Sequence, residues 1–133
     1  MIKAGIVGGA GYTGGELVRV LLNHPNVELL FVQSRSQAGE FLSSLHPDLL
    51  GETDLKFVNA VSFDIDVLFL CMGHGASSEF FEKHEVPSSV KVIDLSQDFR
   101  LDNDKVYGLP ELNREAIQSA DFVANPGCFA TAI

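Results

Sequence analysis

Residues 8–14 read Gly-Gly-Ala-Gly-Tyr-Thr-Gly, and this stretch decides the fold. Before it, residues 2–7 (Ile-Lys-Ala-Gly-Ile-Val) form a short apolar run that predicts a buried strand. After it, the apolar side chains of residues 17, 18, 21 and 22 recur at helical spacing. A strand that leads through a glycine-rich turn into a helix is the setting of a dinucleotide-binding site. The glycines allow a pyrophosphate to approach the backbone, and the first turn of the helix would offer it unpaired N–H groups.

The spacing of these glycines fits two versions of the motif, Gly9-x-Gly11-x-x-Gly14 and Gly8-x-x-Gly11-x-x-Gly14. A glycine pattern alone is also compatible with an ordinary turn between a strand and a helix. The predicted strand before it and the predicted helix after it favour the nucleotide interpretation.

The end of the second predicted strand, residues 27–32, bears on the choice of cofactor. Sites for NAD usually carry Asp or Glu there, which accepts hydrogen bonds from the ribose hydroxyls. Here the sequence reads Gln33-Ser34-Arg35-Ser36. Two hydroxyls and a guanidinium would bind a 2′-phosphate, which a carboxylate would repel. We therefore predict NADP, with a polar loop in which Arg35 is merely solvated as the alternative.

The rest of the chain alternates between the two kinds of element. Strands are predicted at 55–58, within 64–72, at 90–95 and at 122–124, and helices near 40–45, from 77 or 78 to about 83, at 114–119 and from 129 onward. This alternation predicts an α/β fold with a doubly wound parallel sheet and right-handed crossovers, a Rossmann-type domain over residues 1–133.

Two loops follow strands at the edge of the sheet where ligands bind. In the first, Gly73 and Gly75 allow close approach of a cofactor, and Ser77 or Ser78 is expected to cap the next helix. His74 either contacts cofactor or substrate or bonds the loop backbone. In the second loop, Asp98 and Arg100 are expected to pair, as a structural bridge or as part of the floor of the site.

The two cysteines have different settings. Cys71 lies inside an apolar strand and is expected to be a core residue. Cys128 follows Pro126 and Gly127 and precedes a predicted helix, where the helix dipole favours a thiolate. The same amide groups could stabilise an oxyanion on a carbonyl attacked by the sulfur. Cys128 is therefore the candidate nucleophile, with a residue that only fills the turn as the alternative.

Two of the histidines, His46 and His84, are expected to have no functional role. His46 precedes a proline and is assigned to a loop. His84 lies among charged residues at the end of a helix and is expected to face solvent.

Composition limits the remaining classes of function. The chain has 133 residues, a hydrophobic fraction of 46% and a net charge of −9, which argues against a nucleic-acid partner. No apolar run is long enough to cross a membrane. The first residues lead directly into a strand without the pattern of a signal peptide, and two cysteines suit a reducing compartment. We therefore expect a cytoplasmic protein.

Five segments together resemble the N-terminal part of the N-acetyl-γ-glutamyl-phosphate reductase family, over essentially all 133 residues. Residues 8–17 are similar to the cofactor loop of that family, and residues 34–39 to its 2′-phosphate contact. Residues 92–101 and 107–111 are similar to two motifs that border its active site, and residues 125–132 to the segment with its catalytic cysteine. The resemblance implies cofactor binding by Gly8, Gly11, Tyr12, Thr13, Gly14, Ser34, Arg35 and Ser36, and catalysis by Cys128. Gly73 and His74 join the expected cofactor-binding residues because of their place in the loop at the ligand edge.

The resemblance implies reduction of an acyl phosphate to an aldehyde by NADPH, through a thioester on Cys128, in arginine biosynthesis. It also implies a homo-oligomer and a second α/β domain that carries a histidine base and the substrate pocket. That domain is absent from these 133 residues, so we expect a fragment that is incomplete for turnover.

Three other readings stay open. One is a non-catalytic NADP-binding module in which Cys128 is structural. The others are reductases for aminoadipyl or aspartyl phosphate. The aspartyl enzyme would carry Asn directly after the cysteine, so Phe129 and the Tyr12-Thr13 pair favour the glutamyl enzyme.

Overall fold

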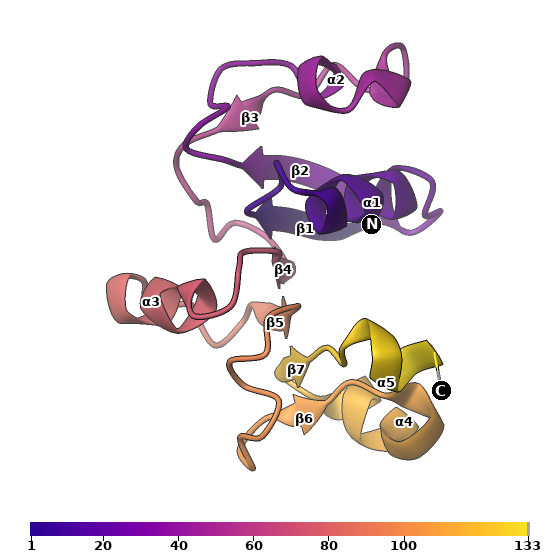
Figure 1. Cartoon of the computed structure of the whole chain (residues 1–133), viewed down its shortest axis with the longest axis vertical. Helices are drawn as coiled ribbons and strands as arrows, with labels where there is room; N and C mark the ends of the chain where they lie inside the picture. The colour runs from indigo at the N-terminus through magenta and orange to yellow at the C-terminus, as the bar shows by residue number, and fades with distance from the viewer. Residues whose placement is uncertain (133) are drawn as a thin grey trace.

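A computed structural model of the chain, described over residues 1–132, shows one parallel sheet flanked by helices (Figure 1). Seven strands are paired in the order β3-β2-β1-β4-β5-β7-β6. The strands are β1 (Ile2–Val7), β2 (Val27–Gln33), β3 (Phe57–Val58), β4 (Val67–Leu70), β5 (Lys91–Asp94), β6 (Val106–Tyr107) and β7 (Phe122–Ala124). The helices are α1 (Tyr12–Leu22), α2 (Leu42–Leu45), the 3-10 helix η1 (Pro47–Leu49), α3 (Ala76–Lys83), α4 (Pro110–Ser119) and α5 (Cys128–Ala132).

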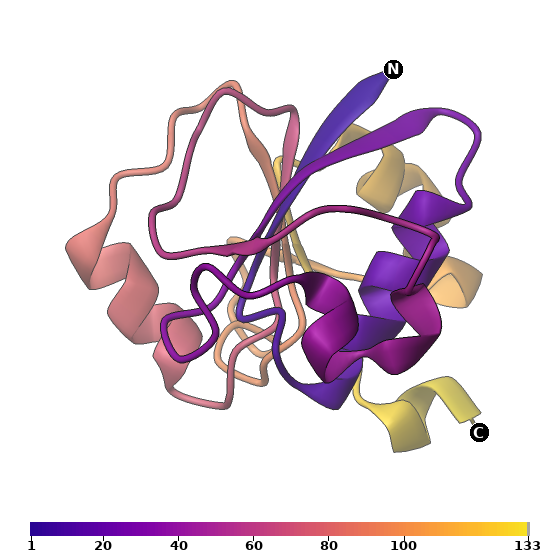
Figure 2. The same cartoon turned by 90° about the horizontal axis from the view of Figure 1, so that it is seen from above.

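The helices cover both faces of the sheet. Seen from above, α3 lies on one face, whereas α1, α2, α4 and α5 lie on the opposite face (Figure 2). The strand order runs outward from β1 to β3 in one direction and from β4 to β5 in the other. The predicted doubly wound sheet is therefore confirmed, and its topological switch point lies between β1 and β4.

Two hydrophobic clusters, one on each face, hold the central strands. Ala4 and Ile6 of β1 pack with Val18 and Leu21 of α1. Val7, the last residue of the same strand, joins Leu68, Leu70 and Phe80 in the second cluster. Strands buried on both faces have nearly continuous apolar sequences, which explains the apolar residues 4–7 of β1 and 67–70 of β4.

The register of the strands aligns their carboxyl ends in one row. Val7 pairs with Gln33 on one side and Leu70 on the other, Leu70 pairs with Asp94, and Asp94 pairs with Ala124. The loops that follow β1, β2, β4, β5 and β7 therefore leave the sheet at the same edge. This edge carries the glycine loop at one place and Cys128 at another.

Several boundaries differ from the sequence-based expectations. Residues 106–107, where no strand was predicted, form β6 and pair with β7. Helix α4 begins at Pro110 rather than at 114, with a kink at Asn113, where φ is −127° and ψ is 25°. The Asn113 side chain donates to the carbonyl of Tyr107 at 2.9 Å, which joins α4 to β6.

The start of the last helix also differs from the prediction. Helix α5 starts at Cys128, one residue before the predicted start, and Ile133, which was assigned to the same helix, lies outside the described residues. Over residues 1–132 no helix combines the length and the apolar character needed to span a membrane.

Candidate functional site: the carboxyl edge of the sheet

The glycine loop is tight because its backbone segments touch. Gly8 has a positive φ of 80°, and a Cβ on Gly14 would lie 2.6 Å from the Cα of Gly9. The amides of Gly8 and Gly9 both donate to the carbonyl of Gln33 at 3.0 Å, which ties the loop to the end of β2. Only glycine fits these positions without a shift of the backbone.

The same loop leaves space for a ligand at the start of α1. A Cβ on Gly11 would meet no atom within 4 Å, and no side chain caps the helix at Gly11. Tyr12 and Thr13, the first residues of α1, are exposed, Tyr12 to 97%. Free N–H groups and a helix dipole at an open position suit a phosphate group.

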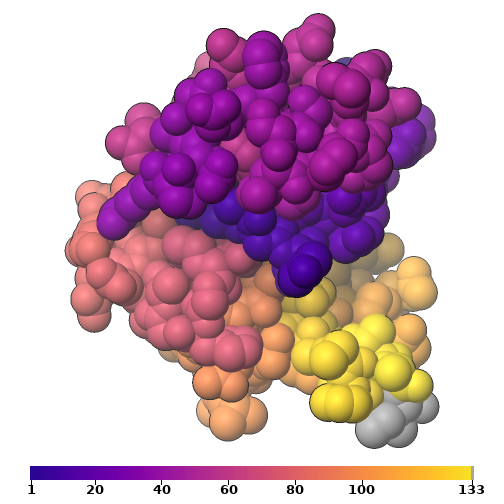
Figure 3. Space-filling model, turned by 45° about the horizontal axis from the view of Figure 1, so that its top comes forward, coloured from indigo at the N-terminus to yellow at the C-terminus, as the bar shows by residue number. Residues whose placement is uncertain are grey.

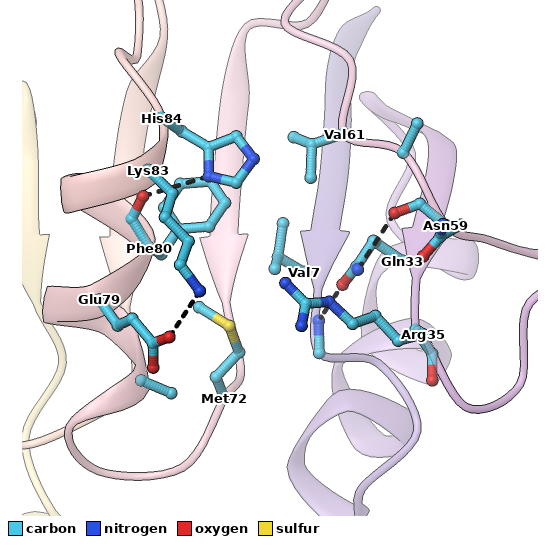
Figure 4. Close-up of a pocket in the computed structure, with 14 residues that line it drawn as sticks. Val7, Gln33, Arg35, Asn59, Val61, Met72, Glu79, Phe80, Lys83 and His84 are labelled. Carbon is cyan, nitrogen blue, oxygen red and sulfur yellow. Dashed lines mark hydrogen bonds and ion pairs between the residues drawn. The ribbon is translucent and has the colours of Figure 1, made fainter.

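The segment after β2 borders a cavity of about 580 Å³. The amide of Ser34 donates to the carbonyl of Val58 at 3.0 Å, and the hydroxyls of Ser34 and Ser36 lie 3.4 Å apart. Arg35 extends into the space between the β2 end and α3 (Figure 4). No carboxylate lies in residues 33–36, so the feature that selects NAD is missing from its usual position.

The loop between β4 and α3 is held by the loop after β5. The carboxylate of Asp98 accepts hydrogen bonds from the amides of Gly75 at 2.7 Å and Ser78 at 3.0 Å. Asp98 therefore caps α3, and the prediction that the side chain of Ser77 or Ser78 does so is wrong. Partial burial opposes ionisation of Asp98, but these N–H donors outweigh it, so the pKa of the carboxyl lies below its usual value.

His74 makes a backbone contact, but with a different loop. Its Nδ1 accepts a hydrogen bond from the amide of Gln97 at 3.0 Å, which joins the loop after β4 to the loop after β5. Gly73 and His74 are both exposed at the carboxyl edge, and a Cβ on Gly73 would meet open space. The contact of these two residues with a cofactor stays a prediction.

A buried carboxylate lies beneath these loops and was not singled out from the sequence. Asp94 is fully buried at the end of β5. Its Oδ1 accepts from the hydroxyl of Ser77 at 2.6 Å and the amide of Ser96 at 3.2 Å, and its Oδ2 accepts from the hydroxyl of Ser96 at 2.8 Å. Because a buried charge is costly unless its acceptors are filled, this network fixes α3 against β5.

Arg100 contacts the segment that precedes Cys128. Its Nε donates to the carbonyl of Asn125 at 2.9 Å and its Nη2 to that of Leu95 at 3.2 Å. The guanidinium thus links the ends of β5 and β7. The expected pair with Asp98 does not form, because Asp98 accepts from the loop before α3 and Arg100 donates to backbone carbonyls of Asn125 and of its own loop.

Cys128 and Cys71 differ in their exposure to solvent. Cys128 is exposed at the first residue of α5, beyond the carboxyl end of β7. Burial and the nearby charge of Asp94 raise the pKa of the Cys71 thiol to about 12. The prediction of a core role for Cys71 agrees with this setting, and Cys128 is the accessible thiol of the pair.

Three strand spacings separate the end of β1 from the end of β7, which is about 14 Å at the usual distance between strands. The space-filling view shows indigo N-terminal residues and yellow C-terminal residues on one face of the molecule (Figure 3). An extended dinucleotide is long enough to bridge such a separation. The glycine loop and Cys128 therefore meet the geometric requirement of a shared site.

Two histidines have roles that the sequence did not indicate. His46 is buried, and its Nε2 lies 3.2 Å from the carbonyl oxygen of Gly9. A Cβ on Gly15 would lie 2.6 Å from the His46 ring, so the imidazole fits directly under the glycine loop. No local pattern signals this contact, which joins residues 37 positions apart.

His84 lies against α3 rather than in solvent. Its ring stacks on that of Phe80 with centroids 4.3 Å apart, and its Nδ1 lies 3.1 Å from the Phe80 carbonyl. His84 also lines the cavity that Arg35 borders. The expectation of an exposed position is therefore wrong.

Comparison with known proteins agrees with this architecture. Residues 3–120 match the family described as semialdehyde dehydrogenase, NAD binding domain. The chain belongs to this family. Among solved members of the semialdehyde dehydrogenases, the type II aspartate enzyme of Vibrio cholerae superposes with a TM-score of 0.75 at 24% identity, covering 98% of this chain and 43% of that one. The aspartate semialdehyde dehydrogenase of Candida albicans, solved with NADP, superposes with a TM-score of 0.77 at 18% identity, covering 98% of this chain and 44% of that one.

Curated relatives of this semialdehyde dehydrogenase domain are more similar in sequence. N-acetyl-γ-glutamyl-phosphate reductases of Bacteroides thetaiotaomicron and Christiangramia forsetii are 57% and 54% identical over the whole chain. The chain spans 42% of the length of each of them.

Proposed function

We propose that this chain is the cofactor-binding and nucleophile-bearing part of an N-acetyl-γ-glutamyl-phosphate reductase. One observation carries the proposal: the glycine loop, the Arg35 cavity and Cys128 all lie at the carboxyl edge of one parallel sheet. The names and the identities of the curated relatives support the glutamyl substrate over the aspartyl and aminoadipyl alternatives. Because the chain spans 42% of those relatives, the activity, the substrate and the partners of the whole protein belong to the proposal.

The residues at this edge fit NADP. The close approach of Gly9 and Gly14 and the open space at Gly11 form a cradle for the pyrophosphate, with Gly8, Tyr12 and Thr13 around it. Ser34 and Arg35 line the cavity, and the Ser36 hydroxyl lies 3.4 Å from that of Ser34, so that two hydroxyls and a guanidinium would bind the 2′-phosphate. When it is bound, NADPH supplies the hydride that converts a thioester into an aldehyde.

Cys128 would act as the nucleophile. Its thiolate attacks the acyl carbon of the substrate, the carbon–oxygen bond to phosphate breaks, and inorganic phosphate leaves. The product is a thioester on the sulfur, and the aldehyde is released when that sulfur leaves as thiolate after reduction. Arg100 holds the backbone before Cys128 through Asn125, which keeps the sulfur at the edge of the sheet.

The expected cytoplasmic location and the assembly of the whole protein into a homo-oligomer remain predictions. So does the assignment of residues 1–133 to a single NADP-binding domain of a two-domain enzyme.

The choice of cofactor is tested by Arg35→Ala. Loss of the guanidinium should weaken binding of NADPH by roughly tenfold or more and leave NADH unchanged, since NADH has no 2′-phosphate. Dissociation constants of both cofactors from calorimetry check this, with Arg114→Ala on α4 as a control for the change of charge. An equal loss of affinity for both cofactors would contradict the phosphate role.

The enzymatic assignment is tested against the non-catalytic module by acylation. Incubation with N-acetylglutamyl phosphate should release phosphate in a single turnover and leave one acyl group on Cys128, detected by mass spectrometry. Cys71→Ser should acylate normally and Cys128→Ser should not. Normal phosphate release from Cys128→Ser would support the module instead.

A further inference from the structure

The cavity beside the glycine loop has a second cationic wall that the proposed function does not use. Its lining comes from the ends of β1 and β2, from residues 59–61, and from α3. Its volume of about 580 Å³ lies within the range of small-molecule sites. Arg35 enters from the β2 side, and Lys83 enters from α3 on the opposite side (Figure 4).

Lys83 is held in place by a neighbour on its own helix. Its Nζ donates to Oε1 of Glu79 at 2.6 Å, one helical turn away. An ammonium group has three N–H donors, and this pair uses one of them. The side chain is 52% exposed, so the remaining donors are available to a ligand in the cavity.

The carboxylate of Glu79 interacts electrostatically with both cations. The hydrogen bond and the charge of Lys83 lower the pKa of Glu79, and the charge of Arg35 lowers it further. Glu79 also lines the same cavity as Arg35 and Lys83. A ligand anion placed there would be attracted by Arg35 and Lys83 and repelled by Glu79.

We propose that Lys83 is a specificity-determining residue that binds the 2′-phosphate of the cofactor from the side opposite Arg35, and that Glu79 orients it and offsets part of its charge. This inference rests on the proposed binding of NADP. A phosphate monoester carries close to two negative charges at neutral pH and accepts several hydrogen bonds, so it can use a guanidinium and an ammonium together.

The apolar part of the cavity suits the base that would accompany this phosphate. Phe80, Val61 and Met72 line the same space, and the His84 ring is stacked on Phe80. An adenosine 2′-phosphate has this combination of a flat aromatic group and a dianion. Adenosine 2′,5′-bisphosphate is therefore a sufficient probe, and AMP is the matched ligand without the 2′-phosphate.

Lys83→Met tests the proposal, because methionine keeps the apolar stem of the side chain and removes the charge. Calorimetry should show affinity for adenosine 2′,5′-bisphosphate falling by roughly tenfold and affinity for AMP unchanged. In the same variant the affinity for NADPH should fall and the affinity for NADH should stay unchanged. An unchanged unfolding temperature would show that the variant is folded.

Lys91→Met is the matched control. Lys91 is also paired with a carboxylate, Asp121, and its side chain is 53% exposed, but it begins β5 and so lies at the opposite edge of the sheet. This variant has the same change of charge and should bind all four ligands normally. Glu79→Gln should tighten the bisphosphate about twofold to fivefold, because it removes a repelling charge and keeps an acceptor for Lys83.

The outcomes separate the two proposals. If the wild-type chain prefers the bisphosphate to AMP and Lys83→Met keeps that preference in full, the role of Lys83 is wrong and NADP binding stands. Equal weakening of both ligands by Lys83→Met would also overturn the role. If the wild-type chain shows no preference for the 2′-phosphate, the NADP proposal fails, and the role of Lys83 fails with it.

Discussion

The carboxyl edge of the sheet differs in structure between its β1–β2 end and its β7 end. Around β1, β2 and α3, the glycine loop and two charged walls enclose a cavity, and the strands beneath are buried on both faces. Around β7, Cys128 is exposed and its neighbour Phe129 is 81% exposed. In the segment before Cys128, the carbonyl of Asn125 accepts from the Arg100 side chain and its amide donates to the carbonyl of Asp94 at 2.8 Å. We therefore expect cofactor recognition to be a property of the described chain itself, whereas the nucleophile is open to any small reagent.

The largest effect expected from this contrast is in alkylation of the two cysteines. With a pKa raised to about 12, roughly one Cys71 thiol in ten thousand is ionised at pH 8. Cys128 should react with iodoacetamide about 100-fold faster or more, since it is exposed, whereas Cys71 is partly buried and its thiol pKa is raised. Peptide mass spectrometry of timed samples measures both rates. Equal and slow labelling of both thiols would remove the distinction and support a structural role for Cys128.

At the cofactor end, Gly14→Ala should have the next largest effect. The new Cβ would lie 2.6 Å from backbone of Gly9, so the loop must move. We expect loss of about 1–3 kcal/mol of stability and about 100-fold weaker NADPH binding. Denaturant unfolding and calorimetry measure these quantities.

Gly11→Ala is the control for the glycine loop. Its Cβ would meet open space and its φ is −78°, so the unfolding free energy should change by less than about 1 kcal/mol. The methyl group would project where the ligand is expected, so NADPH affinity should still fall. Normal NADPH binding by both variants would show that the loop does not hold the cofactor.

A smaller effect is expected beneath the loop. His46→Phe keeps an aromatic ring in place and removes the hydrogen bond to the Gly9 carbonyl. Leaving that carbonyl without a partner should cost about 1–3 kcal/mol of unfolding free energy. Because both cofactors carry the pyrophosphate that this loop is proposed to bind, the affinities for NADPH and NADH should fall by the same factor. A selective loss of NADPH would place His46 in a different role.

The smallest effect concerns acid stability. Since the folded-state pKa of Asp98 lies below its ordinary value of 3.8, its contribution is complete above that pH and is lost as the pH falls through the lower folded-state value. The unfolding temperature should fall as the pH is lowered from about 5 to 2. In Asp98→Asn this decrease should therefore be smaller by a few degrees. Parallel acid slopes for the variant and the wild type would show that capping of α3 does not depend on this charge.

The fold was largely predictable because its signals are local. Apolar runs such as 2–7, the helical spacing of Val18 and Leu21, and the glycine loop each lie within a dozen residues. Short elements were less predictable. Strand β6 has two residues, and it forms because the neighbouring β7 offers backbone partners at Val123 and Ala124.

The site was predicted in part, for the same reason. The glycine loop, residues 34–36 and Cys128 were located from their own sequence context. The partners of Asp98 and Arg100 were not, because each side chain bonds to backbone more than 20 residues away rather than to the other. His84 was assigned to solvent because its neighbours are charged, yet its ring stacks on Phe80 one turn earlier.

The sequence by itself determined the order of the longer strands and helices, the glycine-rich turn between a strand and a helix, the absence of a carboxylate at the end of β2 and the placement of a cysteine at the start of a helix. Tertiary structure alone decided that His46 supports Gly9, that Asp98 caps α3, and that Lys83 faces Arg35 across a cavity. The physical reason is the parallel pairing of the strands, whose carboxyl ends lie in one row. It brings loops from distant parts of the chain to one edge, and no periodicity within a segment records which of them will touch.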